Sequence, residues 1–283
     1  MIMLKRKLQV VIISDVHLGT YGCHATELVQ YLKSIEPEIL VLNGDIIDGW
    51  AFSKRYFPAS HMQVFKEITS FISKGTKVYY ITGNHDEMLR RYSGFTLGNF
   101  HLDDKLMLDL DGKKTWIFHG DVFDASTNGA AKWLAKLGGK GYDILILLNR
   151  FINFILTLFG RDKMSFSKKV KASVKRAVSW IGDFEQCAAE MGIQKGYDFV
   201  ICGHIHQPQD RTIQTADGSI RYLNSGDWIE NLTALEYESG QWNIYQYEAA
   251  KTAHQTVYEL TKKHPFPDVI NNPIELVIQS ILK

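Results

Sequence analysis

The sequence predicts an α/β fold, and three observations support this prediction. Five short apolar segments are rich in valine, isoleucine and aromatic residues, as strands buried on both faces are. Amphipathic helical patterns separate the first three of these segments, which is typical of a parallel or mixed sheet. Residues 211–247 have no helical pattern and resemble antiparallel strands.

The expected elements follow one another in a simple order. The strands are expected at residues 8–14, 38–44, 77–83, 114–118 and 197–203. Helices are expected at 23–37 and 60–75, the second with Ser60 as a candidate N-cap and Gly75 as its stop. Two hairpins are expected to turn at Asp217-Gly218 and Ser239-Gly240.

Composition is that of an ordinary globular protein. Of the 283 residues, 45% are hydrophobic and 22% are charged, and the net charge of +1 favours no class of partner. The three cysteines are scattered, which argues against a disulfide framework or a thiolate zinc site. The first residues lack the features of a secretory signal, so a cytoplasmic location is expected. The longest apolar segment, 144–159, is too short and too polar to span a membrane.

Polar side chains that can bind metals follow each of the five expected strands. They are Asp15 and His17, Asp45 and Asp48, Asn84, His85 and Asp86, His119 and Asp121, and His204 and His206. In open α/β sheets, ligands bind at the carboxyl ends of the strands. Oxygen and imidazole groups without thiolates suit manganese, iron, zinc or magnesium in a hydrolytic site. Asp15 and His17 can point to the same side if strand geometry continues through the turn.

Each motif alone is weak evidence for a metal site. In "VICGHIHQP", for example, His204 and His206 could be metal ligands, an acid and a base, or polar residues in a turn. Five successive strand ends that each offer a metal-compatible side chain are much harder to obtain by accident. The set as a whole therefore indicates a metal centre.

The order "DVH", "GDIID", "GNHD", "HGD" and "GHIH", within residues 14–206, resembles the calcineurin-like metallophosphoesterase superfamily. The resemblance implies a two-sheet α/β sandwich, flanked by helices, that holds two divalent metal ions, with manganese the expected metal. Carried over by motif, one ion is held by Asp15, His17, Asp45 and His206. The second is held by Asp45, Asn84, His119 and His204, so that Asp45 bridges the two ions.

The resemblance also implies roles for residues that do not bind metal. His85 is expected to protonate the leaving group or stabilise the transition state, and Asp86 is expected to orient it. Asp48 is expected to cap the next helix or to contact the site, and Asp121 to contact a ligand histidine. Asp227, in "NSGDW", is expected in a loop that faces the site.

A long helical insertion, residues 125–195, separates two parts of the expected core, 1–124 and 196–250, and residues 251–283 form a C-terminal extension. Within the insertion, the apolar segment 144–159 precedes residues 161–176, which hold seven Lys or Arg and one acid. This pairing suits a substrate with acyl chains and phosphates, or an anionic membrane surface, and we predict a cap that binds them. Nucleic acid fits less well because stacking aromatics are not interleaved with the charges. The expected contact residues are Arg150, Lys168, Lys169, Lys171 and Lys175.

The position and length of the insertion resemble the branch that includes UDP-2,3-diacylglucosamine diphosphatase. That branch cleaves a pyrophosphate in lipid A synthesis, giving UMP and the acylated sugar 1-phosphate, and would work at the cytoplasmic face of the inner membrane. Its best-described members carry arginine where this chain has His85, so the chain departs from that branch at this position. Hydrolysis of another nucleotide or phospholipid is the alternative, whereas a binding protein without activity is disfavoured because all seven ligand positions are intact.

Overall fold

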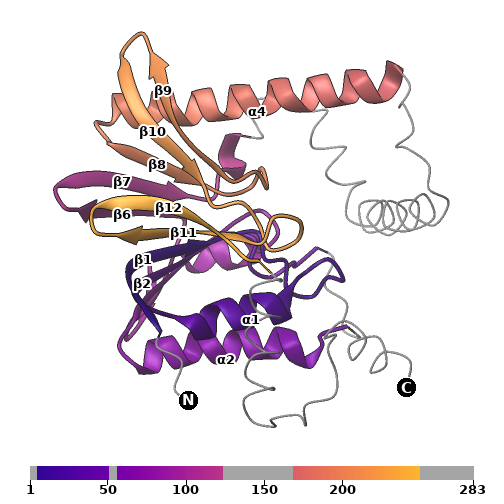
Figure 1. Ribbon diagram of the computed structural model, residues 1–283, viewed down its shortest axis with the longest axis vertical. Coiled ribbons are helices and arrows are strands. Elements are labelled where there is room, and N and C mark those ends of the chain that lie inside the picture. The colour runs from indigo at the N-terminus through magenta and orange to yellow at the C-terminus, as the bar shows by residue number, and fades with distance from the viewer. Residues whose placement is uncertain (1–4, 51–55, 124–167, 249–283) are drawn as a thin grey trace, which may run out of the picture. The chain divides into compact units, whose positions relative to one another are not determined.

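The computed structural model describes residues 5–50, 56–123 and 168–248, with side chains from residue 181 onward in the last range. In these residues, seven strands form one mixed sheet in the order β12-β11-β1-β2-β3-β5-β4 (Figure 1). Strands β1, β2, β3 and β5 are parallel, and β11, β12 and β4 are antiparallel to their neighbours. The bounds are β1 Arg6–Ile13, β2 Ile35–Asn43, β3 Lys77–Ile81, β4 Phe95–Leu97, β5 Phe100–Asp103, β11 Thr233–Glu238 and β12 Gln241–Gln246.

A second sheet of five strands, again counted over the described ranges, has the order β6-β7-β8-β10-β9. Its bounds are β6 Lys105–Leu110, β7 Lys113–Phe118, β8 Phe199–Cys202, β9 Gln209–Thr215 and β10 Gly218–Asn224. Strand β8 is parallel to both β7 and β10. The strands before His119 and His204 are therefore neighbours, although 80 residues of chain separate them.

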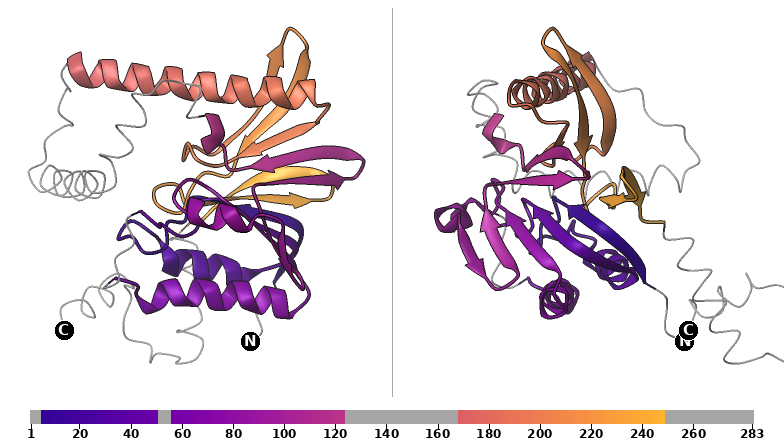
Figure 2. Two further views of the ribbon diagram at one scale, coloured as in Figure 1. Left: turned by 180° about the vertical axis from the view of Figure 1, so that it is seen from behind. Right: turned by 90° about the vertical axis from the view of Figure 1, so that its left-hand side faces the viewer.

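The two sheets pack face to face, with helices on their outer faces (Figure 2). Val10, Val41 and Ile81 of the first sheet share one core with Ile117 and Ile201 of the second. Helices α1 (Ala25–Ser34) and α2 (Ala59–Ser73) cover the first sheet, and α4 (Lys168–Gln194) covers the second. The short 3₁₀ helices η1 (Glu87–Tyr92) and η2 (Asp121–Phe123) follow β3 and β7. The predicted fold class, an α/β two-sheet sandwich flanked by helices, is confirmed.

Three details differ from the prediction. The first helix ends at Ser34 because Ile35 already begins β2, where it pairs with Arg6. Ser60 does not cap α2, which begins at Ala59 after Pro58 without a side-chain cap hydrogen bond. Strands β4 to β6 were not predicted, because they are short or have no buried face, and so carry little hydrophobic signal.

The stop of α2 at Gly75 is confirmed. The helix ends at Ser73, Lys74 follows as the C-cap, and Gly75 has φ +97°, which disfavours other residues. Cys202, expected in the core, is fully buried on β8.

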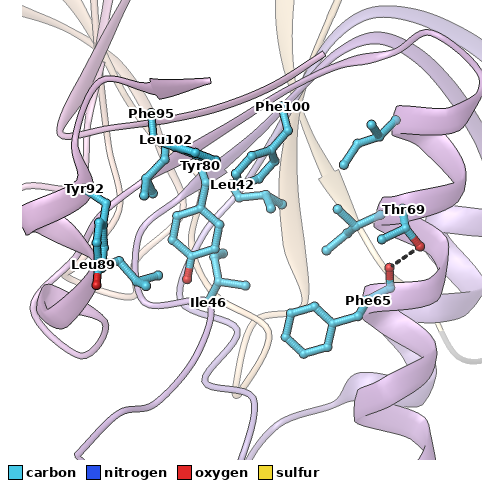
Figure 3. A pocket seen from close by; sticks show the side chains of 12 residues that line it. Leu42, Ile46, Phe65, Thr69, Tyr80, Leu89, Tyr92, Phe95, Phe100 and Leu102 are labelled. Carbon is cyan, nitrogen blue, oxygen red and sulfur yellow. Dashed lines mark hydrogen bonds between the residues drawn. The ribbon is translucent and has the colours of Figure 1, made fainter. Parts of the chain in front are cut away.

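An apolar pocket of about 520 Å³ lies between α2 and the helix-covered side of the first sheet (Figure 3). Its walls include Phe65 and Ile68 of α2, Tyr80 of β3 and Phe100 of β5. Two wall residues carry hydroxyl groups that make hydrogen bonds within the protein. The Thr69 hydroxyl donates to the Phe65 carbonyl within α2, and the Tyr80 hydroxyl donates to Asp86. None of the strand-end histidines lines this pocket.

The second half of α4 belongs to the body of the fold. Phe184 is fully buried, and it packs in one cluster with Phe123, Val200 and Tyr222. Glu185, the next residue, pairs with Arg211 of β9. The boundary of the expected insertion at residue 195 stays a prediction, but its last turns are anchored to the second sheet.

We expect Phe184→Ala to lower the free energy of unfolding by about 3–5 kcal/mol, because it leaves a cavity in this cluster. Met191→Ala, at a 37% exposed position of the same helix, should cost less than about 1 kcal/mol. Urea unfolding followed by circular dichroism measures both. Similar small losses in the two variants would contradict the anchoring of α4.

Candidate metal centre

The expected ligands come together through unusual backbone, not through continued strands. Strand β1 ends at Ile13, and Asp15 and His17 have φ values of 52° and 53°. Asp45, His204 and His206 are also left-handed, at 54°, 69° and 52°. The expectation that strand geometry carries Asp15 and His17 to one side is wrong. Left-handed turns aim them instead, and such strained residues concentrate at functional sites.

The expected ligands form two compact groups among the described residues, and His17, Asp48 and His85 form a further cluster of the same kind. One group is Asp15, His17 and His206, and the other is Asp45, His119 and His204, with the ligand atoms of each group within 4.8 Å of one another. His206 Nε2 lies 3.2 Å from Asp15 Oδ1, and His119 Nε2 lies 3.2 Å from Asp45 Oδ2. His17 Nε2 lies 4.0 Å from Asp45 Oδ2 and so connects the groups. Each group contains three of the four residues expected for one ion.

Buried atoms without hydrogen-bond partners mark where cations fit. At this site, within the described residues, His17 Nε2, His119 Nε2, Asn84 Oδ1 and His85 Nδ1 are buried and have no such partner. In His119 and His17, the other ring nitrogen has a hydrogen-bond partner. His119 Nδ1 donates to the Asn43 carbonyl at 2.9 Å, and His17 Nδ1 lies 3.1 Å from Asp48 Oδ2. These contacts leave both Nε2 atoms unprotonated in the neutral ring, as metal ligands must be. The donor set therefore fits divalent cations.

Glycine is required where the loops press on the carboxylates. A Cβ at Gly83 would lie 2.3 Å from Asp45 Oδ1, and one at Gly203 would lie 2.7 Å from Asp15 Oδ2. No larger residue fits at these two positions without moving a carboxylate. The glycines that the sequence places beside the motifs thus let the backbone approach the site.

The carboxylates and histidines of the site set each other's pKa values. Burial alone would raise the pKa of Asp45, but His119 and His17 bring it well below its usual range. Burial would also raise the pKa of Asp15, but His206 outweighs this effect and the pKa of that carboxyl is lowered. Conversely, burial would lower the pKa of His206, and the Asp15 carboxylate raises it to about 9. Without metal, this histidine is therefore protonated at neutral pH.

Asp48, not Asp86, lies against His85. Asp48 Oδ2 is 3.0 Å from His85 Nδ1 and also 3.1 Å from His17 Nδ1. Asp86 has other partners: its carboxylate accepts hydrogen bonds from Tyr80 Oη at 2.6 Å and from the backbone N–H groups of Gly83 and Ile46 at 2.6 and 3.0 Å. The expectation that Asp86 orients His85 is wrong, because these bonds hold Asp86 in the loop behind the site. Asp48 does not cap α2, the next helix described, whose N-cap is Pro58.

Comparison with known proteins agrees with this geometry. A model of the calcineurin-like phosphoesterase domain matches residues 8–208. The chain belongs to the calcineurin-like phosphoesterase family.

This phosphoesterase is similar to curated proteins named UDP-2,3-diacylglucosamine hydrolase. The protein of Aliivibrio fischeri is 26% identical over 84% of this chain and 98% of its own length. That of Blochmanniella pennsylvanica is 25% identical over 90% and 100%, and that of Stenotrophomonas maltophilia is 23% identical over 82% and 96%. With the family match, these relatives support a metal-dependent phosphoesterase.

Two further carboxylates, Asp121 and Asp227, were predicted to lie near the site of this phosphoesterase. Asp121 pairs with Arg90 at 2.9 Å. Burial would lower the pKa of the expected ligand His119, but the charges of Asp45, Asp15 and Asp121 together raise it. Asp227 accepts three backbone N–H bonds and one from Asn231 Nδ2, which also donates to the His206 carbonyl at 2.7 Å. Asp227 therefore supports the His206 loop from behind.

Two residues near the site were missed by sequence reasoning. Asn231 connects Asp227 to His206, and no motif marks it. Trp50 stacks on His85, with 4.2 Å between ring centroids, and its only signal is its position directly after "GDIIDG".

The expected substrate-contact residues are described only in part. Lys168, Lys169, Lys171 and Lys175 lie in the first turns of α4, where side chains are not described, and Arg150 lies outside the described residues. In the part of the chain that the structure describes, no helix is both long and apolar enough to cross a membrane.

We expect Mn²⁺ binding to the metal-free protein to strengthen with pH, by roughly tenfold per unit between pH 7 and 9 for each proton released. The pKa of His206 is raised to about 9, so at pH 7 a proton must leave before the ring can bind metal. Isothermal titration in buffers of different ionisation enthalpy measures both affinity and proton release.

The control is His101→Asn, because His101 lies on β5 and contacts Thr96 rather than the site. This variant should keep the wild-type pH dependence. Affinity that stays constant from pH 7 to 9 in the wild type would show that His206 is not a ligand.

Proposed function

We propose that this phosphoesterase hydrolyses the pyrophosphate bond of UDP-2,3-diacylglucosamine, giving UMP and the acylated sugar 1-phosphate. The observation that carries the reaction class is the pair of ligand groups joined at Asp45, with His85 beside them. The relatives' names support the substrate, since the similarity extends over nearly their whole length. Lipid A synthesis is the pathway that this assignment implies.

Two Mn²⁺ ions are the proposed cofactors. Asp15, His17, Asp45 and His206 would hold one ion, and Asp45, Asn84, His119 and His204 the other. Bound there, the ions would supply a hydroxide nucleophile and neutralise charge on the phosphoryl oxygens. Iron, zinc or magnesium could bind the same oxygen and imidazole atoms.

The proposed role of His85 is to protonate the leaving oxygen. Its Nδ1 is buried and lies 3.0 Å from Asp48 Oδ2, so we assign donation to the substrate to Nε2. Burial lowers the pKa of His85, but Asp48 and Asp45 together raise it above the ordinary value. These carboxylates therefore favour the protonated ring that a general acid needs.

The proposed substrate class also rests on the basic insertion. Its lysines lie at the start of α4, and Phe184, farther along the same helix, packs in the core cluster of the second sheet. A basic segment of this kind suits phosphate groups at an anionic membrane surface. We therefore place the enzyme at the cytoplasmic face of the inner membrane, bound peripherally.

A second candidate is hydrolysis of another nucleotide or phospholipid. His85 favours it, because the diphosphatase branch carries arginine at this position and general phosphoesterases carry histidine. The two candidates share the metal chemistry and differ only in what the insertion recognises.

We expect at least about 100-fold higher kcat/KM for UDP-2,3-diacylglucosamine than for soluble UDP-N-acetylglucosamine, because acyl binding energy would be used in the transition state. Asp45→Asn should reduce both rates below about 1%, since both ions lose their shared ligand. Release of UMP is the measurement. Equal turnover of the two substrates would favour the second candidate, whereas full activity of Asp45→Asn would exclude the two-metal mechanism.

Replacing Lys168, Lys169 and Lys171 with Glu should weaken binding to phosphatidylglycerol vesicles by about 100-fold, because each lysine near an anionic surface contributes about 1 kcal/mol. The matched control replaces Lys66, Lys74 and Lys77, three exposed lysines on the body, with Glu. Vesicle sedimentation measures both triples. Equal binding by the two triples would mean that the basic segment is only a solvated face.

A further inference from the structure

Three consecutive residues, 48 to 50, all contact His85. Asp48 Oδ2 lies 3.0 Å from Nδ1 of the imidazole. Gly49 donates its backbone N–H to the His85 carbonyl at 2.8 Å. The indole of Trp50 lies against the imidazole in a tilted arrangement, with 4.2 Å between centroids and 30° between planes. The turn after β2 thus holds both the backbone and the ring of His85.

These contacts restrict different motions. A contact at one nitrogen fixes a point of the ring but leaves the ring free to swing about that point. Stacking on a face removes this freedom, because a tilted imidazole loses contact area with the indole. On another side the ring meets His17 edge-on, with centroids 4.5 Å apart at 83°. The Asp48 carboxylate lies 3.0 Å from Nδ1 without a well-aligned hydrogen bond, so the Trp50 ring on the face of the imidazole is the contact that restricts the direction of Nε2.

The backbone around Trp50 is built to keep the indole in place. Trp50 donates its N–H to Asp48 Oδ1 at 3.0 Å, so one carboxylate holds the imidazole with one oxygen and the stacking residue with the other. A Cβ at Gly49 would lie 2.7 Å from the His85 carbonyl oxygen, so only glycine allows this close approach. The indole is nonetheless 48% exposed, which is a high value for a tryptophan that serves only packing.

We propose that Trp50 is a positioning residue that sets the orientation of the His85 ring, and so aims Nε2 at the oxygen that leaves phosphorus. Trp50 acts through His85 and need not touch the reacting atoms. This inference rests on the proposed role of His85 as the proton donor. It predicts that loss of the indole matters only when the leaving oxygen needs a proton.

The first test measures hydrolysis of two phosphodiesters by the Mn²⁺-loaded enzyme. The leaving group of methyl phenyl phosphate needs a proton more than that of methyl 4-nitrophenyl phosphate does. Nitrophenolate leaves without a proton, whereas phenolate leaves more easily with one. Trp50→Leu should lower kcat for the phenyl ester about 10-fold or more and change the nitrophenyl ester less than about 2-fold. Trp50→Phe should restore most of the loss because it restores the stacked ring. Tyr92→Leu, which removes a 53% exposed aromatic on η1, should change neither rate.

His85→Ala separates the two hypotheses. If His85→Ala slows both esters equally, the proposed acid role fails. If it slows the phenyl ester selectively and Trp50→Leu slows both esters equally or neither, the acid role stands and the positioning role of Trp50 is overturned.

The second test does not use activity. In ¹⁵N-histidine spectra of the metal-free protein, with His85 assigned by His85→Gln, the wild type and Trp50→Phe should give a single sharp set of ring signals. Trp50→Leu should broaden or shift only the His85 signals. Unchanged His85 signals in Trp50→Leu would overturn the proposal.

Discussion

The site depends on one buried carboxylate. Asp45 is 2% exposed, and its Oδ2 lies 3.2 Å from His119 and 4.0 Å from His17. Its Oδ1 accepts the backbone N–H of His85 at 2.8 Å. Residue 83 must be glycine, because a Cβ there would lie 2.3 Å from the same oxygen. A buried carboxylate needs positive charge and donors around it, and here they come from three separate loops. Asp45, at the end of β2, thus gathers the ends of β1, β3 and β7 around one point.

This arrangement uses strained backbone, which the sandwich must hold. Asp15, His17, Asp45, His204 and His206 all have positive φ, a conformation that costs non-glycine residues free energy. The last residues of the strands that lead into these turns are buried, including Ile12 and Ile13 of β1 and Ile201 of β8. The shared core between the sheets fixes the strand ends, and the ends have little freedom to relax. Rigid strands therefore support strained loops.

The chemistry of the site could be predicted from the sequence, but much of its geometry could not. Strand ends were predictable because buried strands have a strong apolar pattern and because metal-binding side chains directly follow them. The left-handed turns were not, since non-glycine residues rarely adopt that conformation and nothing in "DVH" or "HIH" indicates it. The partner of His85 was misassigned because the nearest carboxylate in sequence, Asp86, turns inward to Tyr80 and the loop amides. The true neighbour, Asp48, is 37 residues earlier and becomes close only through the parallel pairing of β2 and β3.

Asp48 links the two functions of the site. One oxygen, Oδ2, lies beside Nδ1 of both His17 and His85, and the other, Oδ1, accepts the N–H of Trp50. Two imidazoles at a single oxygen cannot orient independently, because a shift of the carboxylate toward one weakens its contact with the other. The position of the proton on His17, which frees Nε2 for metal, is therefore coupled to the direction of Nε2 in His85. With the roles proposed for His17 and His85, metal binding and proton donation would share Asp48, so a mutation at Asp48 would disturb both at once, whereas one at Trp50 would disturb the second alone.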